Sequence, residues 1–145
     1  MKKVLFLCTG NSCRSQMAEG WTRHYWGEII EPYSAGVEKH GLNPYAVKVM
    51  AEVGIDISNH YSKTIDELPT LDFDLVVTVC DSARERCPLF PKKTKVLHKS
   101  FEDPPYLAKS ATTEKEILNI YRKIRDEIGE FVKVLPTLLL PNDTS

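Results

Sequence analysis

Short apolar runs alternate along this chain with longer segments whose apolar residues recur at helical spacing. The short runs lie at residues 3–8, 29–34, 74–80 and 94–98. The run at residues 3–8 is continuous, which is typical of a strand buried on both faces of a sheet, whereas polar residues interrupt the runs at 29–34 and 94–98. The pattern therefore predicts four strands, of which the second and fourth have the weakest signal.

Three helices are predicted between and after these strands, at residues 15–26, at residues 44–53 and from residue 114 to about residue 135. Asn43 and Pro44 are a cap and a first-turn proline for the second helix. Thr113 and Glu116 have the spacing of a capping box at the start of the third. That helix carries a long apolar stripe, which we expect to pack in the core against the sheet: Ile117, Ile120, Tyr121, Ile124, Ile128, Phe131, Val132 and Leu135.

Strands that alternate with helices predict a parallel sheet with right-handed crossovers. We therefore expect an α/β fold, a three-layer sandwich with a four-stranded parallel sheet and helices on both faces. A single domain should span residues 1–137, and residues 138–145 read as a loose C-terminal tail.

Charge and hydropathy exclude several classes of function. The 145 residues hold 19 Lys and Arg against 20 Asp and Glu, a formal charge of -1. A protein that binds nucleic acid usually has an excess of basic residues, which this chain lacks. No apolar run approaches the roughly 18 residues of a membrane helix, and the apolar start ends at Cys8, too early for an export signal. We expect a cytoplasmic monomer with no membrane or nucleic-acid partner.

Four cysteines then need an explanation: Cys8, Cys13, Cys80 and Cys87. Permanent disulfides are rare in the cytosol, and the spacings differ from those of structural zinc sites. The four histidines lack metal-ligand spacing as well, so we expect no metal ion and no cofactor. From composition alone, catalytic or redox thiols and ordinary buried thiols remain equally open.

The ends of the predicted strands favour a chemical role. Ligands of doubly wound folds bind outside the carboxyl ends of the strands. Cys8 ends the first strand, Cys80 ends the third, and Asp103 follows the fourth. Each has an ordinary explanation by itself, as core thiol or turn carboxylate. Together they predict a site at one edge of the sheet.

The segment between the first strand and the first helix has the form of an anion cradle. Cys8 and Arg14 are separated by five residues, which can curl their backbone N–H groups inward, backed by the following helix. Arg14 supplies a planar fork for a tetrahedral oxyanion, and the same dipoles favour the Cys8 thiolate. Ser15 is either the helix cap or a hydroxyl that supports that thiolate. The predicted oxyanion-binding residues are Thr9, Gly10, Asn11, Ser12, Cys13, Arg14 and Ser15.

These residues resemble a known family. The sequence of residues 8–21, CTGNSCRSQMAEGW, is similar to the signature of arsenate reductases built on the low-molecular-weight tyrosine phosphatase fold. The likeness continues through YSAG, HGLNP, DISNH, DLVVTVC and FEDP, and it covers about residues 2–135. The cradle and Cys13 are shared with the phosphatases, whereas the pair Cys80 and Cys87 resembles the thioredoxin-coupled reductases.

The resemblance implies a relay of thiols. Cys8 attacks arsenate held by the cradle and Arg14, while Asp103 protonates the departing oxygen. Cys80 then attacks Cys8 and releases arsenite, and Cys87 attacks Cys80 to carry the disulfide outward. Thioredoxin or a similar dithiol protein would reduce the final pair. If the short segment between Cys80 and Cys87 is helical, it must unwind or bend before they can join.

Two further consequences belong to the resemblance. Several members bind potassium beside the cradle, and Asn11, Glu19 and Ser34 match three of the ligand positions, but the fourth, a carboxylate, falls on Lys63. We expect no potassium stimulation, with the Lys63 ammonium in that place. Phosphate and sulfate should bind as analogues of arsenate. Two other functions stay open: a phosphatase with bystander thiols, and a non-enzymatic thiol sensor.

Overall fold

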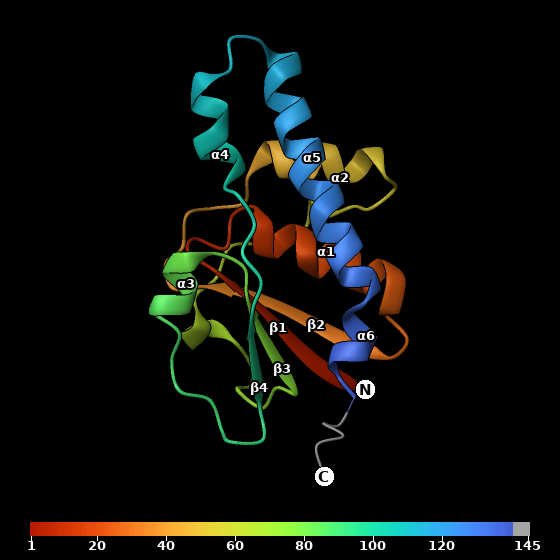
Figure 1. The fold of residues 1–145 in the computed structure, drawn as a ribbon, viewed down its shortest axis with the longest axis vertical. Coiled ribbons are helices and arrows are strands. Elements are labelled where there is room, and N and C mark those ends of the chain that lie inside the picture. Colours follow the sequence, from red (N-terminus) through yellow and green to blue (C-terminus); the bar gives the residue numbers. More distant parts are fainter. Residues whose placement is uncertain (141–145) are drawn as a thin grey trace.

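The computed structural model describes residues 1–140 and contains one parallel sheet (Figure 1). Its strands are β1 (Lys2–Cys8), β2 (Ile30–Gly36), β3 (Leu75–Thr78) and β4 (Lys95–His98). They are ordered β2-β1-β3-β4, and every neighbouring pair is parallel. The four predicted strands and their parallel arrangement are therefore confirmed.

Helices occupy most of the remaining chain. They are α1 (Arg14–Trp26), α2 (Pro44–Glu52), α3 (Asp81–Glu85), α4 (Pro104–Leu107), α5 (Glu114–Lys133), α6 (Leu135–Leu138) and the 3-10 turns η1 (Ile65–Glu67) and η2 (Ala108–Ser110). The three long helices lie where the sequence predicts them. Asn43 caps α2 by accepting from the N–H groups of Tyr45 and Ala46.

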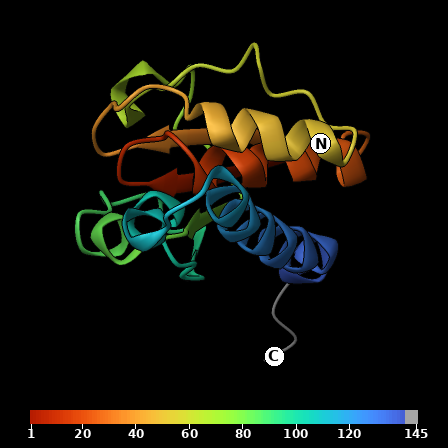
Figure 2. The same cartoon turned by 90° about the horizontal axis from the view of Figure 1, so that it is seen from above.

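The sheet is covered on both faces, as predicted for three layers. Helices α1, α2 and α5 gather on one side, while η1 and the segment that leads from α3 to β4 lie on the other (Figures 1 and 2). All of β3 and the last five residues of β1 are buried, because strands between two layers have no solvent face. The long helix α5 packs mainly against α1 and α2 and makes fewer contacts with the strands. Of its predicted stripe, Tyr121, Ile124, Ile128 and Val132 are buried.

Some local predictions are wrong. Helix α1 begins at Arg14 with Cys13 in the cap position, so Ser15 is not its cap. Thr113 does accept from the N–H of Glu116, but the Glu116 carboxylate accepts from the N–H of Thr112 instead of closing the capping box.

The predicted tail also begins too early, because Leu138 still belongs to α6. The rest of the predicted tail from residue 141 onward lies outside the described residues. Within residues 1–140, none of the helices has the length and apolar character that a bilayer crossing requires.

Candidate active site

The cradle is the loop that joins β1 to α1, and Asn11 fixes its shape. This buried residue has a φ of 50°, the left-handed conformation that a tight curl requires. Its amide nitrogen donates to Ser15 Oγ over 2.9 Å. Its amide oxygen accepts from Gln16 Nε2 and from the N–H of Lys63, each over 3.0 Å. The loop is therefore held in shape by its own asparagine.

The segment after β2 turns the carbonyl groups of the cradle outward. Thr9 O accepts from the N–H of Glu38 over 2.8 Å, and Gly10 O accepts from the N–H of His40 over 3.0 Å. A side chain at Gly36 would meet Thr9 O at 2.8 Å, so only glycine allows this close approach. Because outward carbonyl groups do not repel an anion, the interior of the loop suits an oxyanion.

Arg14 lies across the site, and one N–H group of its guanidinium has no hydrogen-bond partner. Its side chain is buried, Nη1 donates to Phe101 O over 2.8 Å, and Nη2 lies 3.6 Å from Asp103 Oδ1. Arg14 Nε is buried and has no hydrogen-bond partner. A buried, unpaired guanidinium N–H is costly. An oxyanion in the cradle would accept from it, as the predicted role of Arg14 requires.

Cys8 ends β1, whereas Cys80 lies two residues beyond the end of β3, as the N-cap of α3, and not at the strand end that the sequence predicts. The two thiols are nonetheless close enough that each has the largest influence on the pKa of the other. Cys8 lowers the pKa of Cys80 to about 5, assisted by the Thr9 hydroxyl 3.1 Å away and the N–H of Ala83 at 3.4 Å. Cys80, together with burial, raises the pKa of Cys8 well above its ordinary value, although Arg14 acts in the opposite direction.

The two thiols therefore titrate as one coupled pair, in which a single negative charge is distributed between Cys8 and Cys80. The two thiols lose one proton readily and the second with difficulty, because one thiolate disfavours another beside it. The Thr9 hydroxyl contributes to this arrangement by donating to Cys80. Sequence reasoning gave Thr9 only an oxyanion role, since residues so far apart along the chain show no common pattern.

The other two thiols differ in accessibility. Cys13 is buried at the start of α1, and burial raises its pKa far above the ordinary value, so its thiol is a poor nucleophile. Cys87 is partly exposed and its thiol donates to Pro88 O at 3.5 Å. Helix α3 separates it from Cys80, at a rise of about 1.5 Å per residue, or about 10 Å for the seven-residue separation. A disulfide needs less than about 7 Å between the alpha carbons.

Asp103 stands at the entrance to the site. It precedes α4, is nearly half exposed and faces Arg14. The structure thus gathers Cys8, Arg14, Cys80 and Asp103 at the carboxyl edge of the sheet, and it leaves Cys87 at the far end of α3.

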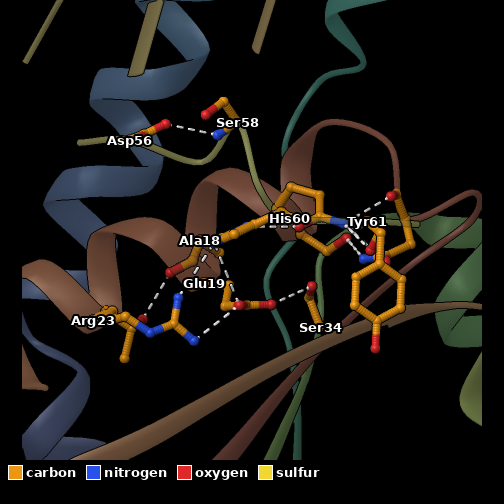
Figure 3. A network of polar contacts seen from close by, with 12 residues as sticks. Ala18, Glu19, Arg23, Ser34, Asp56, Ser58, His60 and Tyr61 are labelled. Carbon is orange, nitrogen blue, oxygen red and sulfur yellow. Dashed lines mark hydrogen bonds and ion pairs between the residues drawn. The ribbon is translucent and has the colours of Figure 1, made fainter. Parts of the chain in front are cut away.

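A second polar network lies behind the cradle (Figure 3). The buried Glu19 carboxylate accepts from Ser34 Oγ over 2.6 Å and from Arg23 Nη2 over 3.0 Å. The Lys63 ammonium instead donates to Tyr61 O over 3.1 Å, so Arg23, and not Lys63, is the cation on Glu19.

The matched oxygens of Asn11 and Glu19 are thus engaged by donors of the chain itself, and the Ser34 hydroxyl is one of those donors. This set does not fit a potassium ion. Among residues 1–140, no group of three His, Cys, Asp or Glu side chains is arranged to hold a metal ion.

Comparisons with known proteins agree with this geometry. The chain is 52% identical over 132 residues to a protein named arsenate reductase from Bacillus subtilis (strain 168), covering 91% of this chain and 93% of the relative. It is 49% identical over 132 residues to "Arsenate reductase 2" of Staphylococcus saprophyticus subsp. saprophyticus, covering 91% of this chain and 94% of the relative.

Solved structures show the same fold. One described as "An arsenate reductase in oxidized state" has a TM-score of 0.79 at 31% identity, with 97% of this chain and 100% of that chain covered. The low molecular weight protein tyrosine phosphatase from T. tengcongensis has a TM-score of 0.72 at 30% identity, with 95% and 99% covered. A family model for the low molecular weight phosphotyrosine protein phosphatase matches residues 3–139. The chain therefore belongs to the low molecular weight phosphotyrosine protein phosphatase family.

Proposed function

We propose that this protein is an arsenate reductase that uses Cys8, Cys80 and Cys87 in sequence. The observation that carries the proposal is the electrostatically coupled pair of Cys8 and Cys80 beside an anion cradle. Ester hydrolysis needs one thiol, whereas reduction of As(V) to As(III) needs two electrons and therefore two thiols. The names of the relatives support the same activity.

The first step forms a bond between Cys8 and arsenic. Arsenate enters the cradle and accepts from Arg14 Nε. Cys8, as the thiolate of the coupled pair, attacks arsenic, while an arsenate oxygen leaves as water. Asp103, which faces Arg14 from the entrance, supplies a proton to that oxygen.

The second step transfers the electrons. Once Cys80 has given up its proton, its thiolate attacks Cys8 Sγ. The electron pair of the sulfur–arsenic bond passes to arsenic, arsenite leaves, and a Cys8–Cys80 disulfide remains. The Cys87 thiolate then attacks Cys80 Sγ, which frees Cys8 and forms a Cys80–Cys87 disulfide. A dithiol protein such as thioredoxin would return two electrons and two protons in the cytoplasm, acting on a monomer.

Consumption of NADPH tests the proposal. With arsenate, thioredoxin, thioredoxin reductase and NADPH, the wild-type protein should sustain turnover. Cys8→Ser, Cys80→Ser and Cys87→Ser should each abolish it, and Cys13→Ser is the matched control that should keep most of the rate. NADPH consumption independent of arsenate, or full turnover without Cys80, would refute the relay.

Phosphate-ester hydrolysis is the second candidate, because the same cradle, Arg14 and Asp103 are the parts that it needs and because a related structure is a tyrosine phosphatase. Cys80→Ser and Cys87→Ser should leave any hydrolysis of aryl phosphates largely intact, whereas Cys8→Ser should abolish it. Aryl phosphate turnover with no arsenate-dependent use of NADPH would favour this alternative.

A further inference from the structure

The short helix α3, which separates Cys80 from Cys87, is tied to the fold at both ends. At its first residue, Asp81 Oδ1 lies 3.1 Å from His98 Nε2. His98 Nδ1 in turn lies 2.8 Å from Thr78 Oγ1. The neutral imidazole with its proton on Nε2 satisfies both contacts, since it donates to Asp81 and accepts from the Thr78 hydroxyl.

This first tie, the Thr78–His98–Asp81 chain, rests on the sheet. Thr78 ends β3 and His98 ends β4, adjacent strands that pair at these two residues. Thr78 is buried at 1% exposure and His98 is mostly shielded, whereas the Asp81 carboxylate is 78% exposed. The two strands therefore hold the beginning of α3, and with it Cys80, in a fixed place.

The second tie is of a different kind. Arg86 follows the last residue of α3, and its Nη1 lies 3.2 Å from Glu38 Oε1. Glu38 also contacts His40, which lies beside the cradle. Arg86 and Glu38 are both about half exposed, and ion pairs between such side chains are weak. Neither side chain of this tie belongs to a strand, whereas the first tie continues through His98 to the buried Thr78 of the sheet.

The proposed relay makes opposite demands on the two ends. The first disulfide needs Cys80 beside Cys8. The second needs Cys87 to move from about 10 Å to within about 7 Å of Cys80, which the folded helix prevents. Arg86 directly precedes Cys87, so it must leave Glu38 when Cys87 moves.

We propose that the Thr78–His98–Asp81 chain positions Cys80 for the first exchange and that the Arg86–Glu38 pair is a clasp that retards the second. His98 is on this view a positioning residue that touches neither substrate nor the sulfur atoms. The inference rests on the proposed function, and it assigns the two ends of one helix to two successive steps.

A single-turnover experiment separates the steps. Reduced protein is mixed with arsenate without thioredoxin, quenched with an alkylating agent at successive times, and its disulfides are identified by mass spectrometry. The rate of Cys8–Cys80 formation is measured in a Cys87→Ser background, and the rate of Cys80–Cys87 formation in the chain with all four thiols.

For the first tie, His98→Ala should slow Cys8–Cys80 formation about tenfold. His98→Gln, which keeps a donor for Asp81, should recover most of the rate. The affinity for inorganic phosphate should not change, because the cradle is intact. Adding Asp81→Ala to His98→Ala should cause little further loss, since both remove the same contact.

For the clasp, Glu38→Gln should leave the first exchange unchanged and accelerate the second about two- to fivefold. Glu130→Gln is the matched control: it removes an exposed ion pair with Lys133 within α5 and should change neither rate.

Three outcomes would overturn the inference: an unchanged first exchange in His98→Ala, a loss of phosphate affinity equal to the loss of rate, or an unchanged second exchange in Glu38→Gln. The proposed function fails separately, when the wild-type protein forms no Cys8–Cys80 disulfide with arsenate.

Discussion

At the scale of single residues, Thr9 links the oxyanion cradle to the second thiol. Its hydroxyl donates to Cys80 Sγ over 3.1 Å, and its backbone hydrogen bond to Cys8 lowers the pKa of that thiol. One residue thus acts on both members of the pair. The balance between them decides which sulfur holds the proton before arsenate arrives.

Thr9→Val removes the hydroxyl and keeps the shape. The pKa of Cys80 should rise from about 5 by roughly one unit, because a hydrogen bond worth about 1–1.5 kcal/mol corresponds to that shift. Thiolate absorbance at 240 nm should therefore disappear at a higher pH in the variant as the solution is acidified.

Thr22→Val is the matched control for that titration, since its buried hydroxyl donates only to Ala18 O within α1. Its thiolate absorbance should titrate as in the wild-type protein. A midpoint unchanged in Thr9→Val would mean that the hydroxyl does not stabilise the Cys80 thiolate.

The sequence was sufficient to predict which of these residues meet, and not how they share a proton. Cys8, Cys80 and Arg14 are placed by strand ends and by the spacing of the cradle, which are local patterns. The pKa of each thiol depends on a tertiary contact with the other, and Thr9 reaches Cys80 across 71 positions of the chain. No sequence spacing encodes such a contact, so the sequence predicts a thiolate at Cys8 and does not indicate that Cys80 titrates together with it.

At the scale of elements, length decides what a pattern can predict. Helices α1, α2 and α5 are long enough for caps and periodicity, and the sequence locates all three. Helices α4 and α6 have four residues each, with a proline in the first turn, and were not predicted. For α3, which has five residues, the sequence predicts only that a helical segment between Cys80 and Cys87 would have to unwind or bend before the two can join. One or two turns carry too little periodic signal.

Oxidation of Cys80 and Cys87 to a disulfide should unfold α3. In Cys8→Ser protein, a thiol oxidant can join Cys80 to Cys87. The alpha carbons of a disulfide are closer together than the folded helix allows these two residues to be. Alpha-carbon chemical shifts of residues 81–85 should then move from helical values toward those of a coil. Shifts in α2 serve as the internal control, and helical values throughout α3 in the oxidised protein would contradict the prediction.

At the scale of the whole molecule, one carboxylate joins the helices that support the cradle. Glu52 at the end of α2 accepts from Arg122 Nη2 over 2.7 Å and from Arg125 Nη1 over 2.9 Å, both on α5. Arg125 O accepts from Trp21 Nε1 of α1 over 3.0 Å. Helices α1, α2 and α5, which pack together beside the cradle, are thus connected through Glu52.

The two guanidinium groups lower the pKa of Glu52 to about 2. A carboxyl group with a lowered pKa in the folded state contributes stability above its ordinary pKa, near 4.5, and loses that contribution as the pH falls through about 2.

Glu52→Gln should therefore lower the free energy of unfolding by about 1 kcal/mol at pH 7, the upper end for partly exposed ion pairs. The difference from the wild-type protein should decrease as the pH falls through about 2, where Glu52 is protonated in the unfolded state and half protonated in the folded state. Urea unfolding at the two pH values measures it, with Asp126→Asn, which touches only Arg125 Nε, as the variant expected to lose less. An equal deficit of Glu52→Gln at both pH values would show that packing, and not charge, holds α2 to α5.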